Sequence, residues 1–435
     1  MAFLYFHFLQ HLHNFYKDEN DILLMKSTPI PVSLFIRNRE KLAGSLASGS
    51  MVVTMSAKRM PRNGDQFFPY RQGSDFFYLT GINLEDCILV LCPNHSDPSL
   101  REILFIPKTT AKSELWSGPG LKQKEAELLS GIKEIRWADE ADEFLKLMLP
   151  VASVVYADQK EKFERDQDIA PLSPHITRLR MKKELEELEE IKKAVQITRS
   201  AFLKILEMAE PDMWEYQLEA EITGEFIRRG ANGHAYEPIV ASGRNALILH
   251  YIQNHSICLD GDLVLMDFGA ERNNYAADCS RTIPVNGKFS KRQLELYGAA
   301  LRVFKQAVKM MKPGVIMADF HKEVGSLWEE EHLNLGLYTR SDVSAQTDGD
   351  PLWKKYYMHG TTHSLGLDVH DPFDRSSPFE PGMVLTCEPG IYIPEEGIGI
   401  RLENDILITD DGQLDLMKDI PIEAGHIEEL MSCCK

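Results

Sequence analysis

Two acidic residues interrupt a pair of predicted strands in the segment LVLMDFGAERNNYAADCSRTIPV, residues 263–285. The apolar runs on either side of its polar turn predict buried strands, yet these runs carry Asp267 and Asp278. Burying an unpaired carboxylate costs several kcal/mol, so such a residue is usually neutralised, paired or bound to a metal ion. The fold of this chain must therefore supply a partner for both aspartates.

The same irregularity occurs again near the end of the chain. Glu388 lies in the apolar run MVLTCEPGIYI, and Glu403 lies in GIGIRLENDILIT. The second run predicts a strand, whose alternation places Arg401, Glu403 and Asp405 on one side. Between the two acidic regions, the segment MHGTTHSLGLDVHD contributes three histidines, which are His359, His363 and His370.

Four carboxylates and one imidazole from these segments form a candidate metal site, made of Asp267, Asp278, His363, Glu388 and Glu403. Four negative charges balance two divalent cations, whereas no visible set of lysines or arginines could do so. Oxygen-rich ligands suit hard or borderline cations such as Mn²⁺. Two such ions close together can share and activate one water for attack on a carbonyl or phosphoryl group. Taken singly, an aspartate at a strand end is more often a cap, and a lone histidine is more often a core residue.

Length and composition narrow the class of protein. A chain of 435 residues predicts two domains, and 43% hydrophobic with 26% charged residues is typical of a soluble globular protein. The net charge of -18 argues against a nucleic acid as the main partner, and no apolar run is long enough to span a membrane. Seven cysteines without a C-x-x-C pair predict reduced thiols in a cytoplasmic protein.

The pattern of apolar runs predicts a small N-terminal α/β domain over residues 25–157, with strands in MVVTM, DCILVLCP, EILFIP and ASVVYA. Residues 1–24 form an aromatic, histidine-rich leader that lacks the features of a secretory signal, and Met25 is an alternative start. A polar stretch with two prolines predicts a linker over residues 158–178. Residues 179–435 are then predicted to form a second domain, with one long amphipathic helix, two further helices and a strand-rich end.

These segments resemble the metallopeptidases of the creatinase, or pita-bread, fold, and most closely the aminopeptidase P (Xaa-Pro aminopeptidase) family. The matching strings are ILHY, MDFGA, DCSRT, HGTTHSLGLDVHD, EPGMVLTCEPGIYI and GIGIRLENDILIT, while PRNGDQFFPYRQGSDFFYLTG resembles the N-terminal domain of that family. The resemblance implies a two-domain α/β protein whose C-terminal half is a pita-bread α+β domain. It also implies that the candidate metal site holds two divalent ions, in this family usually Mn²⁺.

The resemblance implies catalytic roles for several residues. Glu388, besides binding metal, is the implied proton shuttle. His250, in ILHY, resembles the histidine that stabilises negative charge developing on the carbonyl oxygen of the substrate. His359 and His370 resemble the histidines that line the proline pocket on the substrate side.

Three further residues match supporting positions of the family. Arg401 and Tyr236 resemble residues that hold the ligating carboxylates, with ordinary buried hydrogen bonding as the alternative. Trp116, in KSELWSG, resembles a tryptophan that reaches the substrate pocket of a neighbouring subunit. A core aromatic of the small domain is the alternative for Trp116. The resemblance therefore implies a homodimer or homotetramer.

Together with the cysteine pattern, the resemblance implies a cytoplasmic, manganese-dependent Xaa-Pro aminopeptidase, which releases the N-terminal residue from peptides with proline second. The bond before proline is a tertiary amide without an N–H group, and the proline ring fixes the backbone angle, so its cleavage needs a specialised pocket. Two alternatives stay open. One is an Xaa-Pro dipeptidase (prolidase), which shares the ligands but cleaves only dipeptides. The other is an inactive pita-bread-fold protein that binds peptides.

Overall fold

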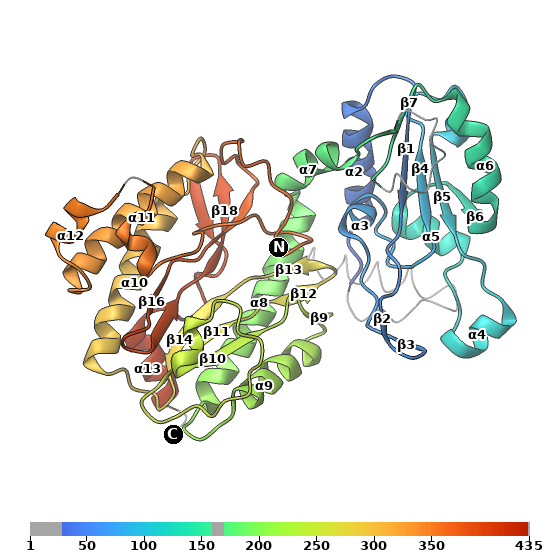
Figure 1. Cartoon of the computed structure of the whole chain (residues 1–435). Helices are drawn as coiled ribbons and strands as arrows, with labels where there is room; N and C mark the ends of the chain where they lie inside the picture. Colours follow the sequence, from blue (N-terminus) through green and yellow to red (C-terminus); the bar gives the residue numbers. More distant parts are fainter. Residues whose placement is uncertain (1–27, 159–168, 348, 434–435) are drawn as a thin grey trace, which may run out of the picture.

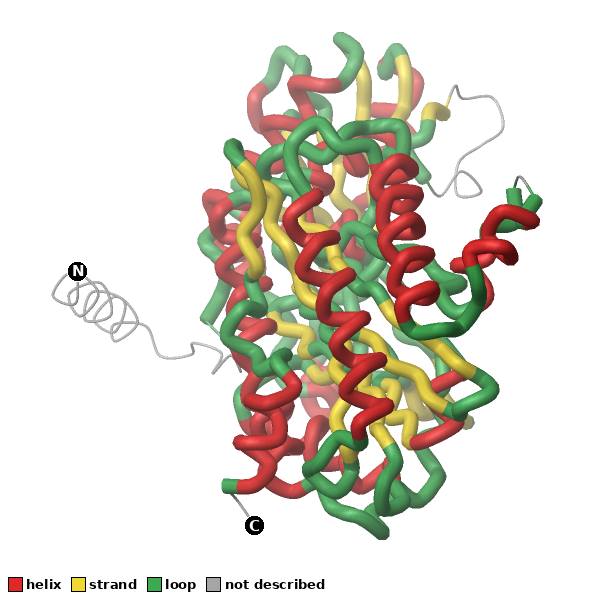
Figure 2. Tube along the Cα trace, turned by 90° about the vertical axis from the view of Figure 1, so that its left-hand side faces the viewer, coloured by secondary structure: helices red, strands yellow, loops and turns green. Residues whose placement is uncertain are grey.

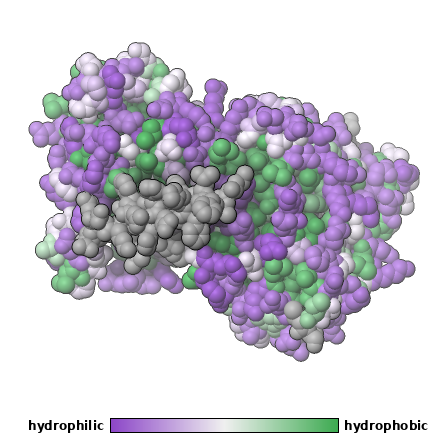
Figure 3. Space-filling view, turned by 180° about the vertical axis from the view of Figure 1, so that it is seen from behind, coloured by the Kyte–Doolittle hydropathy of each residue, from purple (hydrophilic) through white to green (hydrophobic). Residues whose placement is uncertain are grey.

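The chain forms two lobes joined by a helix, as the computed structural model in Figure 1 shows. The structure describes residues 28–158, 169–347 and 349–433, so the predicted leader lies outside the described residues. No helix in these ranges is long and apolar enough to cross a membrane. Figure 3 shows the opposite face of the molecule, where hydrophilic residues cover most of the surface and hydrophobic residues form smaller patches.

The N-terminal lobe is built on a mixed sheet of six strands in the order β6-β5-β4-β1-β7-β8. The strands are β1 (Ser50–Met55), β4 (Ile88–Leu91), β5 (Glu102–Ile106), β6 (Glu134–Trp137), β7 (Val154–Tyr156) and β8 (Ile169–Ala170). The four apolar runs predicted as strands are β1, β4, β5 and β7. Because β8 pairs with β7, the sheet extends into the segment predicted as the linker.

Helices cover both faces of this sheet, which explains its apolar sequence. They are α2 (Val32–Ser45), α3 (Ser74–Thr80), α5 (Gln123–Ser130) and α6 (Ala141–Met148). Val52 of β1 packs in one core cluster with Leu34 of α2, whereas its neighbours Met51 and Val53 pack in a second cluster with Phe144 of α6. Alternate residues of β1 therefore point to opposite faces of the sheet.

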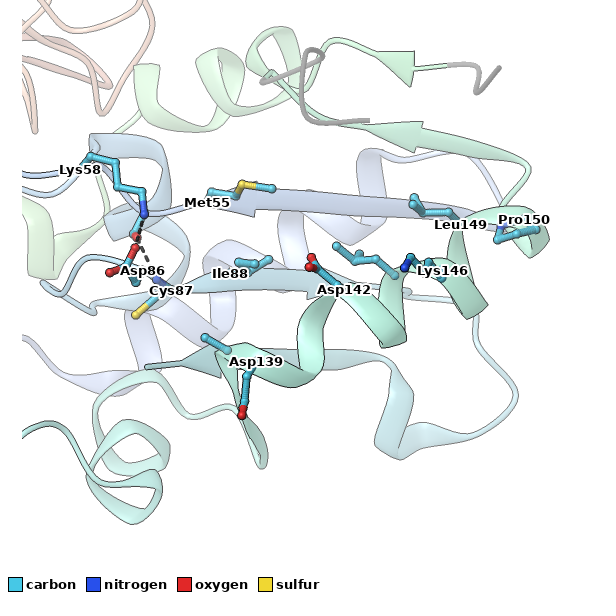
Figure 4. Close-up of a pocket in the computed structure, with 13 residues that line it drawn as sticks. Met55, Lys58, Asp86, Cys87, Ile88, Asp139, Asp142, Lys146, Leu149 and Pro150 are labelled. Carbon is cyan, nitrogen blue, oxygen red and sulfur yellow. Dashed lines mark hydrogen bonds and ion pairs between the residues drawn. The ribbon is translucent and has the colours of Figure 1, made fainter. Parts of the chain in front are cut away.

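A cavity of about 720 Å³ lies on the α6 side of this sheet. Figure 4 shows it between β1, β4 and α6, with Lys58 paired to Asp86 at one end and Lys146 and Pro150 near the other. None of the residues predicted for the catalytic or metal site lines it. The candidate chemistry must therefore be sought in the other lobe.

Two projections extend from the N-terminal lobe at the lower right of Figure 1. One is the hairpin of β2 (Pro61–Asn63) and β3 (Gln66–Phe67), and the other is the short helix α4 (Ala111–Ser117). Trp116 lies on α4 and is 80% exposed, so it is no core aromatic of the small domain. Helix α7 (Ser173–Met181) leads from this lobe into the C-terminal lobe.

The C-terminal lobe repeats one arrangement twice, a pair of helices followed by a group of short strands. The predicted long helices are α8 (Leu185–Met208), α10 (Lys291–Met310) and α11 (Met317–Asn334), and α8 pairs with α9 (Glu215–Arg228). Figure 2, which looks at the molecule from the left of Figure 1, shows helices outside and strands behind them. Two more helices complete the lobe, α12 (Arg340–Ala345) and α13 (Ala424–Ser432).

The strands of this lobe form several small sheets. The first group is β9 (Gly233–His234), β10 (Ile239–Ser242), β11 (Leu263–Asp267), β12 (Ala270–Arg272), β13 (Tyr275–Ala276) and β14 (Ser280–Pro284). The second group is β15 (Val384–Cys387), β16 (Gly390–Ile393), β17 (Ile398–Arg401), β18 (Asn404–Thr409) and β19 (Gly412–Asp415). The sheets run in the orders β10-β11-β14, β13-β12-β9, β15-β18-β19 and β16-β17.

Each predicted acid of the metal site lies where a strand stops. Strand β11 ends at Asp267, β14 begins two residues after Asp278, and Glu388 separates β15 from β16. The prediction of one continuous strand in GIGIRLENDILIT was wrong, because the run divides around Glu403 into β17, which pairs with β16, and β18, which pairs with β15. An alternating pattern cannot reveal this break, since both halves remain apolar.

A buried ionic cluster joins α7 and the N-terminal lobe to the loop 363–371, which carries two of the predicted histidines. Arg180 lies 2.6 Å from Asp75 of α3 and 2.5 Å from Asp371, and Lys183 lies 2.9 Å from Asp371. Burial by itself would raise the pKa of Asp371, but the charges of Lys183 and Arg180 lower it. The loop is therefore held by ion pairs between buried, desolvated side chains.

We expect Asp371→Asn to lower the free energy of unfolding by about 3 kcal/mol, because it leaves Arg180 and Lys183 buried without their main counter-charge. Urea denaturation followed by circular dichroism measures this change. Glu189→Gln on α8 is the control, since its partner Lys192 and Glu189 itself are both exposed, and we expect a change below about 0.5 kcal/mol. Equal effects of the two variants would contradict the prediction.

A second buried acid predicts how stability changes with pH. Glu187 of α8 is 2% exposed, and burial raises its pKa to about 7. It accepts hydrogen bonds from Tyr275 Oη at 3.1 Å and from the backbone N–H of Glu184 at 2.9 Å. Because its pKa in the unfolded chain is about 4.3, the folded state binds more protons between these two values. The contribution of Glu187 to stability therefore falls as the pH rises from about 4.3 to about 7.

We expect Glu187→Gln, which is neutral at every pH, to stabilise the protein more at about pH 8 than at about pH 5. Thermal unfolding of the variant and the wild type at both pH values measures this stability difference. Because groups other than Glu187 titrate alike in both proteins, their contributions cancel when the two proteins are compared. A stabilisation that is equal at both pH values would contradict the prediction.

Candidate active site

A cavity of about 530 Å³ in the C-terminal lobe collects the predicted site residues. The strand breaks form one side of it, and the histidine-bearing loop 363–371 forms another. All the predicted site residues except Trp116 line it, namely Tyr236, His250, Asp267, Asp278, His359, His363, His370, Glu388, Arg401 and Glu403. Segments far apart in the sequence thus meet at one place.

Asp278, His363 and Glu403 form the tightest part of the site. One oxygen of each carboxylate and one ring nitrogen of His363 all lie within 4.8 Å of one another. His363 Nε2 is 3.4 Å from Asp278 Oδ2 and 3.6 Å from Glu388 Oε1. On its other side, His363 Nδ1 lies 3.2 Å from the carbonyl oxygen of Ser364. In the tautomer whose Nδ1–H donates a hydrogen bond to this carbonyl oxygen, the Nε2 lone pair is free to bind a metal ion.

Asp267 is held by two groups that the sequence predicted as supports. Arg401 Nη2 donates to Asp267 Oδ2 at 2.7 Å. Tyr236 Oη lies 2.6 Å from Asp267 Oδ1 and 2.5 Å from Asp278 Oδ1. A phenol has a single proton, so Tyr236 can donate to only one of these carboxylates at a time. The two aspartates therefore have more acceptor oxygens than donors to satisfy them.

Burial disfavours the charged forms of the acids in this cavity. It raises the pKa of Glu388 to about 7 and raises the pKa of Asp278 and of Glu403 as well. Burial alone would lower the pKa of His363, but its hydrogen bond with Asp278 and the charge of Glu388 raise it to about 9. The protein without metal thus keeps protons among these groups.

The donor set fits divalent cations. Among the described residues that line the cavity, Arg401 is the only lysine or arginine, whereas five carboxylates line it, the four predicted acids and Glu237. The side chains of Asp278 and Glu403 are buried, and one oxygen of each carboxylate lies within 4.8 Å of the other. Few hydrogen-bond donors are close enough to compensate their negative charge. Such a group of oxygens with one imidazole is what a hard or borderline divalent ion requires.

His359 reaches the cavity with both ring nitrogens engaged by the protein. Its Nδ1 lies 2.7 Å from the carbonyl oxygen of Gly360, and its Nε2 lies 2.9 Å from Tyr392 Oη. Burial lowers the pKa of His359 to about 3, so the ring is neutral at physiological pH. Arg401 Nη1 donates to the same Tyr392 hydroxyl at 2.9 Å. Tyr392 therefore connects His359 to the residue that holds Asp267.

His250 and His370 are the histidines with ring nitrogens available to a ligand. Both side chains are exposed, and neither ring has a hydrogen-bond partner among the described residues. The ring of His370 packs edge-on against that of His363, with centroids 4.3 Å apart. A peptide entering the cavity would therefore meet two imidazoles that can donate or accept hydrogen bonds.

Sequence reasoning missed three supporting residues. Besides Tyr392, Ser280 Oγ donates to Glu403 Oε2 at 2.7 Å, and Thr386 Oγ1 lies 3.4 Å from Glu388 Oε1. Ser280 and Thr386 are each two residues from a predicted ligand, which is a signal that the sequence offered. No signal of that kind marks Tyr392, which lies in the apolar run of β16.

Comparisons with known proteins support both halves of this description. Residues 35–156 match the family described as aminopeptidase P, N-terminal domain, and residues 189–410 match metallopeptidase family M24. The Xaa-Pro aminopeptidase of Escherichia coli (strain K12) is 36% identical, with 91% of this chain and 97% of that protein covered. Xaa-Pro aminopeptidase 3 of Homo sapiens is 32% identical, with 91% of this chain and 83% of that protein covered.

A solved structure agrees in shape. The zinc-substituted aminopeptidase P of E. coli in complex with product matches with a TM-score of 0.87 at 34% identity, covering 94% of this chain and 100% of that one. This match confirms the predicted two-domain fold with a C-terminal pita-bread domain. The chain therefore belongs to metallopeptidase family M24, and it carries the N-terminal domain of aminopeptidase P.

Proposed function

We propose that this protein is an Xaa-Pro aminopeptidase, which hydrolyses the bond between the N-terminal residue of a peptide and a proline at the second position. The observation that carries the proposal is the meeting of four carboxylates and His363 in one cavity, beside histidines that a peptide can reach. Relatives named Xaa-Pro aminopeptidase, at 36% and 32% identity over most of their length, support the same activity.

The residues proposed to hold two divalent ions are Asp267, Asp278, His363, Glu388 and Glu403. Mn²⁺ is our first candidate because oxygen ligands dominate the set. When bound, two such ions supply an acidified water for attack and polarise the carbonyl group of the substrate. Tyr236 and Arg401 hold the aspartates by hydrogen bonds and would keep them oriented for metal binding.

The side chains of the protein handle the protons and the substrate. Glu388, which lines the cavity beside His363, is the residue proposed to accept a proton from the attacking water and return it to the leaving nitrogen. His250 donates a hydrogen bond to the oxygen on which negative charge develops, and its position must be fixed before reaction. His370 and the neutral ring of His359 contact the substrate from the side of loop 363–371.

An apolar wall beside these groups suits a proline ring. Ile239, Leu249, Ile252 and Val369 all line the cavity. Because proline has no amide N–H, a pocket for it needs no backbone acceptor at that position, and apolar contact with the ring replaces the missing hydrogen bond. This combination favours proline second over other residues.

A second copy of the chain is proposed to complete the enzyme. Leu115 and Trp116 on α4 are 84% and 80% exposed, and an exposed tryptophan is a common anchor of an interface. We assign Trp116 to the substrate pocket of a neighbouring subunit in a homodimer or homotetramer. All six cysteines in the described residues are free thiols, which supports a cytoplasmic location.

The first prediction of this proposal is that protein stripped by a chelator regains cleavage of Ala-Pro-Ala when Mn²⁺ is added. Alanine release, measured by chromatography, should depend on the metal because two bound divalent ions would acidify the attacking water. Ala-Ala-Ala is the control and should stay intact.

The same assay separates the alternatives. Cleavage of Ala-Pro without cleavage of Ala-Pro-Ala would make the protein a prolidase. If metal-restored protein cleaves neither peptide, the enzyme proposal is wrong and the site belongs to a peptide-binding protein.

The support given by Tyr236 can be tested without removing a ligand. We expect Tyr236→Phe to weaken Mn²⁺ binding about 10-fold to 100-fold, because it removes the hydroxyl that bridges Asp267 and Asp278. Isothermal titration calorimetry measures the affinity. Tyr216→Phe, at a half-exposed position of α9, is the matched control and should bind Mn²⁺ as the wild type does; unchanged affinity in both variants would reject the role of Tyr236.

A further inference from the structure

Glu215, the first residue of α9, is a fully buried carboxylate that no described lysine, arginine or histidine neutralises. Its oxygens instead accept five hydrogen bonds from the loop 243–256 and the strand before it. Oε1 accepts from Ser242 N and Ser242 Oγ, both at 2.7 Å, and from Asn245 Nδ2 at 2.9 Å. Oε2 accepts from Tyr251 Oη at 2.8 Å and from Ser256 N at 2.9 Å.

These contacts hold the loop at both ends and in the middle. Ser242 precedes the loop, Ser256 ends it, and Tyr251 is the residue directly after His250. Glu215 N also donates to the carbonyl oxygen of Ser256 at 2.9 Å, so the backbone and the side chain of one residue fix the same point. A carboxylate can accept this many hydrogen bonds, whereas no neutral side chain of the same size can.

The outer side of the loop offers little packing of its own. Ile248 is 56% exposed and Ile252 is 44% exposed, and they flank His250 on either side. His250 is itself exposed without a side-chain partner among the described residues, so its place depends on the backbone beneath it. That backbone is anchored by Tyr251, whose ring packs in the core cluster that includes Leu265.

We propose that Glu215 is a positioning residue of the reaction, which acts through Tyr251 to keep His250 at the mouth of the candidate metal site. The inference rests on the proposed function, because it assigns His250 to the carbonyl oxygen of the substrate. A donor to that oxygen works only if it is in place before charge develops. Glu215 is not among the residues that line the metal cavity, so its effect on catalysis is indirect.

The test uses Tyr251→Phe and Glu215→Gln in full-length, Mn²⁺-loaded protein. Tyr251→Phe removes one donor and keeps the ring, so it preserves the fold if Glu215→Gln does not. We expect kcat for Ala-Pro-Ala to fall about 10-fold in Tyr251→Phe, while KM and Mn²⁺ affinity stay within about 2-fold. Tyr216→Phe, next to Glu215 but half-exposed, is the control and should keep the kcat of the wild type.

A double-mutant cycle decides whether the effect passes through His250. If it does, Tyr251→Phe should change kcat by less than about 2-fold in a protein that already carries His250→Ala. An undiminished loss in that background, or a parallel loss of Mn²⁺ affinity, would show general structural damage and overturn the inference.

Hydrogen exchange of the peptide 243–256, measured by mass spectrometry, gives a readout that needs no activity. Faster exchange confined to this peptide in Glu215→Gln or Tyr251→Phe supports the anchoring, and exchange equal to that of the wild type overturns it. A wild type that cleaves no peptide would reject the proposed function, while the exchange measurement would still decide whether Glu215 holds the loop.

Discussion

The crowding of four carboxylates in one buried cavity is the constraint around which this protein is organised. Each of these acids costs free energy to bury, and Arg401 is the only permanent positive charge among the described residues that line the cavity. In the fold, a strand begins or ends at or within two residues of every one of these acids, and all four acids line the cavity. Hydroxyl donors such as Tyr236 and Ser280 then fix the direction in which the oxygens point.

The loops that carry the histidines depend on separate anchors outside the cavity. Loop 363–371 is held by Arg180 and Lys183 through Asp371, and loop 243–256 is held by Glu215. The first anchor is an ionic cluster that also contacts the N-terminal lobe, so the position of His363 is linked to the way the lobes pack. The second is a carboxylate that pairs with no cation among the described residues and accepts hydrogen bonds from neutral donors. In both cases a buried charge away from the cavity fixes part of its wall.

Much of the fold and most of the cavity could be read from the sequence, for identifiable reasons. The strands of the N-terminal lobe and the helices α8, α10 and α11 have strong periodic patterns, which depend only on neighbours along the chain. The residues lining the cavity came from the resemblance, because the order of acids and the histidine is preserved in local strings. The division of GIGIRLENDILIT at Glu403 could not be read, since it depends on which strand each half pairs with.

The sequence by itself determined the chemical types at the site, an excess of carboxylates with histidines nearby, because side-chain chemistry is carried residue by residue. Only the tertiary structure decided which atoms meet. It joined His359 to Arg401 through Tyr392, left His250 and His370 open to a ligand, and placed Trp116 on the surface. It also assigned Glu215, an ordinary acid at the start of a helix, to the loop that carries His250. Such contacts join segments that lie far apart along the chain, and they follow from how strands and helices pack in three dimensions.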